Sequence, residues 1–142
     1  MKKVIIFILL FIWQLPQNLL GLIMLLFVGK KTLLSKDNYI YTFKGSKMSG
    51  GISLGQIAIL SETLSRFEEH IAHERDGHTY DSKLFGPLYL LIIGLPSLLW
   101  ATFHSSKKCY YSLYTERWAN KHAGLEVINS DSNRCKLRFI SK

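Results

Sequence analysis

The sequence predicts a small α+β protein that is embedded in a membrane. Two long uncharged apolar runs, residues 4–29 and 86–103, are separated by a stretch with strand patterns followed by a helix pattern. A second helix pattern, residues 110–124, follows the second run. The chain has 142 residues, which suits one domain at most. We divide it into an N-terminal membrane segment, residues 1–31, and a domain of residues 32–142 that the second apolar run interrupts.

The first apolar run is long enough to cross a membrane. As one helix it would extend about 39 Å at ~1.5 Å per residue, more than the hydrocarbon core of ~30 Å requires. It follows Lys2 and Lys3 as a signal peptide would, but it is too long for a signal core and no small-x-small cleavage site follows it. We therefore expect it to be retained. The second run would extend only ~27 Å, which is barely enough to cross.

Two strands are predicted between the apolar runs. In residues 38–44, NYIYTFK, aromatic residues alternate with smaller or polar neighbours, which is a strand pattern. Residues 45–51, GSKMSGG, indicate a turn, and residues 52–60, ISLGQIAIL, indicate a second strand with a bulge at Gly55. We expect the two strands to pair as a hairpin.

A central helix is predicted next, ending at about residue 82, before Gly86. Ser65 and Glu68 have the spacing of a capping box, so the helix should begin near residue 62 or 66. The later helix, residues 110–124, ends on a glycine in the C-cap position. Residues 125–142 are expected to form a short strand or a loose basic tail.

The central helix carries an unusual cluster, residues 70–82, HIAHERDGHTYDS. It approaches the H-E-x-x-H zinc signature, but Gly77 stands where the second histidine should be, and His78 follows one residue later. At about 100° per residue, Glu74 and His78 continue the apolar stripe of the helix, and His73 faces the opposite side. A one-residue π-bulge would bring the two histidines to within ~40° of each other, as in an i, i+4 pair.

That pairing suits zinc, because two imidazoles on adjacent turns bind one ion and the glutamate beside the first takes a proton from the activated water. Residues 114–120, YTERWAN, resemble the ExxA[D/N] element that follows HExxH in gluzincin-type metallopeptidases, including their minimal membrane-bound relatives. The resemblance implies that Glu116 is the third zinc ligand and that Asn120 orients a ligand histidine. Residues 77–101 also resemble small bacterial membrane proteins in which a HExGH-like element precedes GPLYL and GLPS.

Two alignments with that family are open. If one residue is inserted, the metal ligands are His73, His78 and Glu116, and Glu74 is the general base. Without a gap, the ligands would be Glu74, His78 and Glu116, and Arg75 would take the position of the base. Arginine cannot accept a proton at neutral pH, so that protein would bind metal without hydrolysing peptides.

The metal hypothesis restricts the membrane topology. If both apolar runs crossed once, His78 and Glu116 would lie on opposite sides of the membrane. Each run, however, has a proline break near its middle, at 14–18 and 94–97, which is typical of broken or re-entrant helices. Lysines and arginines number two before the first run, eight between the runs and eight after the second, so no side lacks positive charge. We expect all polar parts on the cytoplasmic side of a bacterial inner membrane.

Composition favours lipid over nucleic acid as a partner. The net charge is +8, but the lysines cluster beside the apolar runs, where they would meet lipid phosphates. Cys109 and Cys135 form neither a CxxC metal pair nor a disulfide-rich framework, and a single bridge between them would require an oxidising compartment. Because we expect the polar parts on the cytoplasmic side, we expect both cysteines to be reduced. His70 is interpreted as an exposed neighbour of the cluster, and His104 and His122 are interpreted as structural.

The sequence therefore predicts a membrane-associated zinc metallopeptidase whose peptide substrate pairs with the edge of strand 52–60. One alternative is a catalytically inactive member of the same family. The other is a non-enzymatic protein with two membrane spans, whose middle loop binds a partner or anionic lipid.

Overall fold

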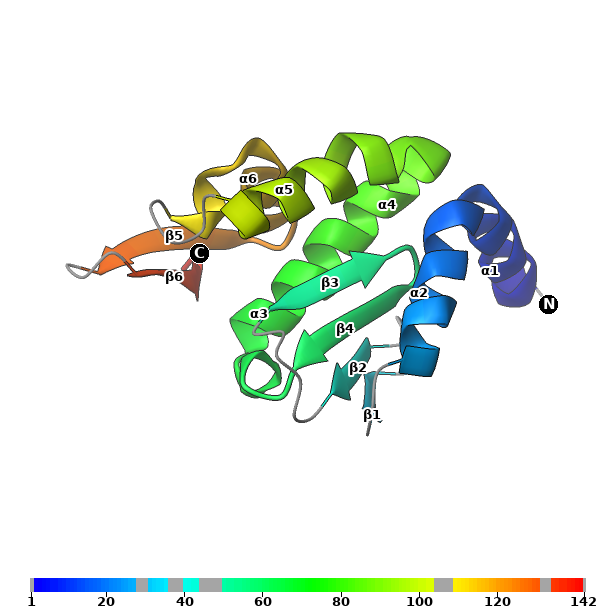
Figure 1. Cartoon of the computed structure of the whole chain (residues 1–142), viewed down its shortest axis with the longest axis horizontal. Helices are drawn as coiled ribbons and strands as arrows, with labels where there is room; N and C mark the ends of the chain where they lie inside the picture. The colour runs from blue at the N-terminus through cyan, green and yellow to red at the C-terminus, as the bar shows by residue number, and fades with distance from the viewer. Residues whose placement is uncertain are drawn as a thin grey trace.

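The computed structural model describes residues 2–27, 31–35, 40–43, 50–103, 109–130 and 134–141. They form helices and two small sheets, which confirms the α+β class (Figure 1). The larger sheet is sandwiched between the N-terminal helices and the central helix. Ile57 and Ile59 pack against Leu25 on one face, and Ala58 and Leu60 pack towards Leu64 and Ile71 on the other. Alternate residues of one strand therefore serve two buried faces.

The larger sheet contains β1 (Lys31–Ser35), β2 (Ile40–Phe43), β3 (Gly51–Leu54) and β4 (Ile57–Ser61), in the order β1-β2-β4-β3. The predicted hairpin is wrong in its pairing. The stretch 52–60 is not one bulged strand, because the chain reverses at Gly55, which adopts φ 70°, and so forms the β3–β4 hairpin by itself. As a result, β2 runs parallel to β4. The predicted turn at 45–51 lies mostly outside the described residues.

The central helix has three parts: α3 (Glu68–Ala72), a π-helix η2 (His73–His78) and α4 (Thr79–Phe85). The predicted capping box is wrong. Ser65 lies in a separate 3-10 turn, η1 (Leu64–Arg66), where its hydroxyl donates to the Glu62 carbonyl oxygen over 2.9 Å. The extended backbone of Phe67 precedes α3 instead. The helix ends as predicted before Gly86, which has φ 51°.

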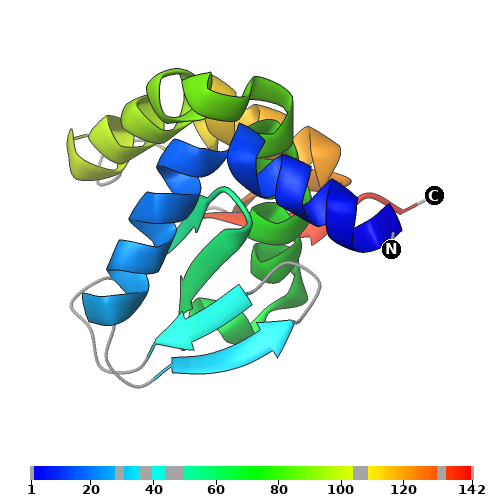
Figure 2. The ribbon, with the colours of Figure 1, turned by 90° about the vertical axis from the view of Figure 1, so that its right-hand side faces the viewer.

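The first apolar run forms α1 (Lys2–Trp13) and α2 (Leu15–Phe27), which meet at 90° (Figure 2). This break lies where it was predicted, and its amide side chains are buried and form hydrogen bonds. The Gln17 side-chain amide donates to Gly86 O over 2.7 Å, and Ser82 Oγ donates to Gln14 Oε1 over 2.8 Å. Asn18 Oδ1 accepts the backbone N–H of Gln56 at 2.8 Å. The bend is thus fastened to α4 and to the β3–β4 turn.

The second apolar run contains a 3-10 turn η3 (Gly86–Leu88), a π-helix η4 (Leu90–Gly94) and α5 (Leu95–Phe103). The bend, 118°, falls between Leu88 and Leu90, so the break predicted at 94–97 is misplaced. Pro96 has no N–H for the carbonyl of Ile92, and the hydroxyl of Tyr114 donates to that carbonyl instead, over 2.5 Å. The proline is therefore accommodated within the helix.

The described helices do not include one that by itself has the length and apolarity to cross a membrane. Two bent pairs meet those criteria together, by length and composition only. They are Lys2–Trp13 with Leu15–Phe27, and Glu68–Leu88 with Leu90–Phe103.

The C-terminal region starts with a 3-10 turn η5 (Tyr110–Ser112) and α6 (Tyr114–His122). Gly124, with φ 67°, follows α6 as predicted. In place of the predicted short strand or loose tail, β5 (Leu125–Ser130) and β6 (Arg134–Phe139) pair as an antiparallel sheet. Leu125 and Leu137 of this sheet pack against Ala72 of α3.

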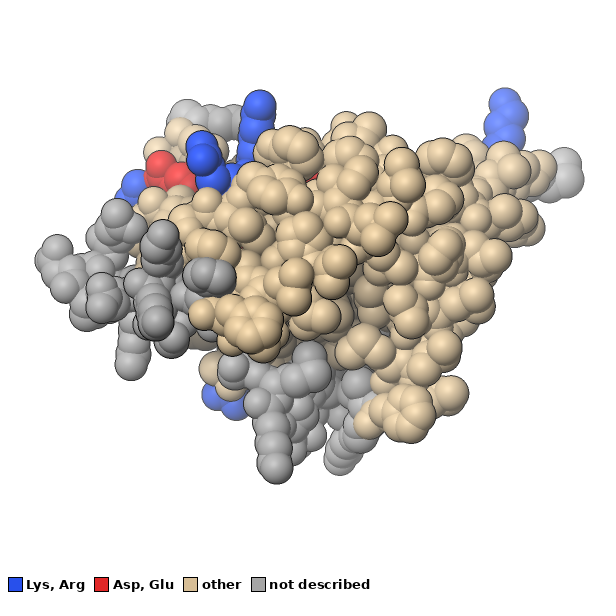
Figure 3. All heavy atoms as spheres, turned by 45° about the horizontal axis from the view of Figure 1, so that its top comes forward, with Lys and Arg blue, Asp and Glu red and all other residues tan. Residues whose placement is uncertain are grey.

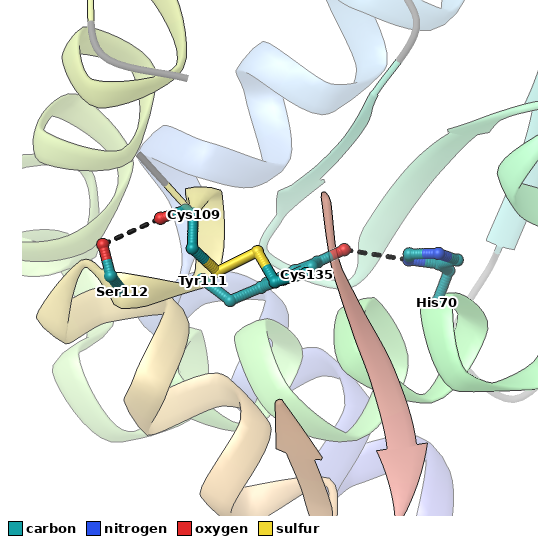
Figure 4. Close-up of a disulfide and its surroundings, with 5 residues drawn as sticks. All are labelled: His70, Cys109, Tyr111, Ser112 and Cys135. Atoms are coloured by element: carbon teal, nitrogen blue, oxygen red, sulfur yellow. Dashed lines mark hydrogen bonds between the residues drawn. A yellow bond between two sulfur atoms is a disulfide. The ribbon is translucent and has the colours of Figure 1, made fainter. Parts of the chain in front are cut away.

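The expectation of two reduced cysteines is wrong. Cys109 and Cys135 form a disulfide, with Cα atoms 5.7 Å apart (Figure 4). The β5–β6 pairing carries Cys135 back to the start of η5, and this pairing could not be read from the spacing of the two cysteines. The bridge holds β6 against the turn that leads into α6.

Candidate metal centre

The π-helix brings the two histidines together. In η2 one extra residue is accommodated in a turn, so residues five apart share a face of the helix. The rings of His73 and His78 lie 4.8 Å apart, nearly perpendicular to each other. The predicted π-bulge, and the pairing of histidines that it produces, are confirmed.

Helix α6 supplies a carboxylate to the same point. Its Glu116 Oε2 lies 3.0 Å from His73 Nε2 and 3.3 Å from His78 Nε2. One ligand atom from each of these three residues lies within 4.8 Å of the other two, and their exposed fractions are only 3%, 6% and 0%. The group could hold a metal ion. Two imidazoles and a carboxylate are the ligand set of one class of catalytic zinc sites.

Gly77 permits the close approach of η2 and α6. A Cβ atom at this position would lie 2.6 Å from the carbonyl oxygen of Ala119 and 2.8 Å from its Cβ atom. Both contacts are shorter than real Cβ atoms show, so any side chain here would push α6 away. The glycine that breaks the zinc signature is therefore a packing requirement, and sequence reasoning assigned it no role.

A polar group lies behind each histidine, and the one behind His73 is close enough to form a hydrogen bond. Asn120 Oδ1 lies 2.8 Å from His73 Nδ1, so an Nδ1–H donor leaves Nε2 directed at the centre. Asp81 is fully buried and lies 3.8 Å from His78 Nδ1 and 2.8 Å from His122 Nδ1. The first contact is the one predicted for Asn120. Sequence reasoning missed Asp81 and treated His122 only as structural, although the i, i+3 spacing of His78 and Asp81 could have indicated their contact.

The second apolar run contributes directly to the centre. Ser97 donates a hydrogen bond to Glu116 Oε1 over 2.8 Å, and its hydroxyl is also 2.8 Å from that of Thr115. Each oxygen of the Glu116 carboxylate thus has its own partners, with histidines on one and hydroxyls on the other. A residue of the second apolar run therefore helps to position the candidate ligand Glu116.

Glu74 lies beside the cluster without belonging to it. Its Oε2 accepts a hydrogen bond from Ser53 of β3 over 2.7 Å, and a Cβ at Gly51 would lie 2.5 Å from Oε1. Arg75 is directed elsewhere and pairs with Asp76 at 2.7 Å. The structure thus brings His73, rather than Glu74, together with His78 and Glu116.

The charges of the cluster stabilise each other. Burial alone would lower the pKa of His78, but the carboxylates of Glu116, Glu74 and Asp81 outweigh it and raise that pKa to about 9. Burial alone would raise the pKa of Glu116, yet the charge of His78 and hydrogen bonds from both histidines hold it well below its usual range. Without a metal, the centre therefore carries an imidazolium paired with a carboxylate.

The remaining histidines lie outside the ligand group. His70 Nδ1 is 3.1 Å from the hydroxyl of Tyr111 (Figure 4). The ring of Tyr111 meets that of His73 edge-on, with centroids 5.4 Å apart. Burial lowers the pKa of His70. His104 lies outside the described residues.

Comparison of the chain with protein-family models, with curated proteins and with solved structures finds no match. The resemblance to gluzincins therefore depends on the quoted motifs alone.

Proposed function

We propose that the protein is a membrane-associated zinc metallopeptidase of the minimal gluzincin type. The observation that supports this most directly is the convergence of His73, His78 and Glu116, with ligand atoms within 4.8 Å of one another. These side chains come from a helix and from a segment about 40 residues later, so the sequence order alone does not place them together. Zinc fits the donor set better than hard cations, which prefer oxygen ligands only.

A zinc ion bound here would supply a Lewis acid and lower the pKa of water. In the proposed reaction, Glu74 accepts the proton of the attacking water and passes it to the leaving amine. Ser53 holds the carboxylate of Glu74 in place through its hydrogen bond. Asn120 holds the ring of His73 through Nδ1.

The substrate is proposed to be an extended peptide at the outer edge of β3. The N–H of Ser61 donates to Gly50 O, so in this antiparallel pair every second residue of β3, counted from Gly50, forms backbone hydrogen bonds with β4. The backbone N–H and C=O groups of Gly51 and Ser53 therefore point away from β4, towards the open edge of the sheet. The hydroxyl of Tyr89 already donates to Ser53 O over 3.1 Å. A peptide would therefore pair around Gly51, next to Glu74, rather than along the whole stretch 52–60.

Membrane attachment is supported by the exposed apolar surface. Figure 3 shows a broad face with almost no charged side chains, and lysines or arginines at its edges. Large apolar side chains are exposed along α1, α2, η4 and α5, including Ile5, Leu9, Leu22, Leu26, Leu91, Leu98 and Phe103. The second run folds back so that His78 and Glu116 meet, which supports embedding without a full crossing.

The side of the membrane needs a different proposal from the one that the sequence suggested. The cytoplasmic prediction, made from the distribution of lysines and arginines, implied reduced cysteines, whereas Cys109 and Cys135 are bridged. Disulfides persist in oxidising compartments and are rare in the bacterial cytosol. We therefore place the polar part on the extracytoplasmic side.

Metal analysis of the purified full chain tests the zinc site. The wild type should carry one zinc ion per chain, and His78→Ala and Glu116→Ala should lose it. His70→Ala is the matched control, because this histidine lies on the same helix outside the ligand group and should keep the metal. Unchanged zinc content in both ligand variants would rule the site out.

Hydrolysis is tested separately with Glu74→Gln and a quenched fluorescent peptide. We expect zinc to be retained and kcat to fall by about 10² to 10⁴, which is the usual contribution of a general base. Glu69→Gln, one turn earlier, is the control. A zinc-loaded wild type with no activity above Glu74→Gln on any peptide would identify a catalytically inactive family member.

A further inference from the structure

Helix α6 has a second functional face. Its inner face carries Glu116 and Asn120 into the metal centre, while Tyr114, Arg117, Trp118 and Lys121 face outward. These four side chains line a pocket of about 480 Å³ on the surface of the molecule. The pocket is separate from the metal centre, and none of its lining residues is a proposed ligand.

The lining combines two cations with two aromatic rings. Among the described residues, neither Arg117 nor Lys121 forms an ion pair, whereas Arg75 and Arg138 are each paired with a carboxylate. Tyr114 and Trp118 meet edge-to-face at 5.6 Å. The guanidinium group of Arg117 and the ammonium group of Lys121 can bind an anion, and the two aromatic rings beside them can contact apolar groups. This combination suits a phosphate group that is attached to an apolar molecule.

The pocket borders the apolar surface. The hydroxyl of Tyr114 donates to Ile92 O in the second apolar run, and the ring of Trp118 stacks on Phe85 at 6.0 Å. Nearby, Leu95, Leu98 and Leu99 of α5 are about half exposed. Tyrosine and tryptophan beside an apolar surface, with basic side chains next to them, are typical of the level of lipid headgroups.

We propose that this pocket binds the phosphate headgroup of an anionic phospholipid, with the acyl chains along α5. The bound lipid sets α6 at the level of the headgroups. Because Glu116 lies on the opposite face of the same short helix, the metal centre is then held close to the membrane surface. The inference goes beyond the proposed peptidase activity, and the binding test does not depend on that activity.

The test is a titration of the detergent-solubilised full chain with dioctanoyl phosphatidylglycerol, followed by calorimetry. Dioctanoyl phosphatidylcholine gives the reference for a zwitterionic lipid, and glycerol 3-phosphate gives that for a soluble phosphate ester. The wild type should prefer phosphatidylglycerol to both. The variant Arg117→Gln/Lys121→Gln should bind it roughly 10- to 30-fold more weakly, as expected for the loss of two interfacial cations.

The matched control is Arg66→Gln/Lys136→Gln, which removes the same charge from two exposed positions outside the pocket. It should bind like the wild type. Trp118→Ala, which keeps both cations, should also weaken binding, and thermal melting should show that all variants fold. Equal losses in the control would overturn the proposal in favour of a general charge effect. Glycerol 3-phosphate binding as tightly as the lipid would overturn it in favour of a soluble ligand.

Discussion

Two π-helices in this protein use the same backbone geometry for different purposes. In η2 the extra residue rotates side chains, so that His73 and His78 share a face. In η4 the irregular turn precedes Pro96, and the Ile92 carbonyl oxygen that the proline cannot pair accepts a hydrogen bond from Tyr114. The π-helix η2 thus brings two side chains to the same face, whereas η4 allows the helix to continue past a proline.

Both irregular turns are fastened to α6. Gly77 of η2 packs on Ala119 of α6. Ser97, just after η4, donates a hydrogen bond to Glu116, and the hydroxyl of Tyr114 donates one to the Ile92 carbonyl oxygen within η4. The two contacts differ in how much added volume or lost bonding they tolerate. At η2 the backbone of Gly77 packs directly on the backbone of Ala119, whereas at η4 the contact is a single hydrogen bond from a hydroxyl group. A substitution at η2 should therefore lower the free energy of unfolding more than one at η4.

The largest effect is expected from Gly77→Ala. The added methyl group would meet the backbone of Ala119, and overpacking of this kind costs about 1 to 3 kcal/mol of unfolding free energy. Displacement of α6 should also remove Glu116 from the cluster and release zinc. Chemical denaturation and metal analysis measure the two effects.

Gly50→Ala is the control for that change, since a Cβ there meets no atom of the described residues within 4 Å. It should leave zinc content unchanged. A Gly77→Ala protein as stable and as zinc-rich as this control would mean that η2 and α6 are not in close contact.

The next effect is a dependence of zinc affinity on pH. The pKa of His78 is about 9 without metal, so at lower pH a proton competes with the ion for this ring. Affinity should rise roughly tenfold per unit from pH 7 to 9 and then level off. The ion pair of the metal-free protein has the opposite dependence: its stabilisation is complete below pH 6.5 and is lost as pH rises through 9.

Competition with a chelator of known pH dependence, at pH 7, 8 and 9, measures that affinity. A flat profile would mean that His78 is not protonated in the free protein, or does not bind the ion.

The smallest effect is expected from Tyr114→Phe, which removes the donor to Ile92 O. Loss of one hydrogen bond costs about 0.5 to 1.5 kcal/mol of unfolding free energy, and zinc should be retained. Tyr80→Phe is the control, because its hydroxyl forms no hydrogen bond within the described part of the chain. A loss above 3 kcal/mol, or a loss of zinc, would show that η4 is as intolerant as η2.

The geometry of the candidate metal centre was more predictable than the fold around it. The spacing of His73 and His78 is one residue longer than in the H-E-x-x-H signature. A π-bulge is the simplest helix irregularity that returns the two histidines to one face. The disulfide and the position of the second bend were not predictable, because they depend on which segments pack together. Gly55 illustrates the limit, since a turn and a bulge both suit an isolated glycine and only the pairing of β3 with β4 distinguishes them.

The covalent bridge between Cys109 and Cys135 closes a ring of the chain, with a separation of 26 residues, that contains Glu116 and Asn120 but neither ligand histidine. A closure of that size reduces the entropy of the unfolded chain, for a stabilisation of about 3 to 4 kcal/mol in the loop-entropy model. The segment that carries Glu116 and Asn120 is thereby restricted by a covalent bond, whereas the segment that carries His73 and His78 is not. Reduction of the bridge should therefore loosen one side of the candidate metal centre more than the other.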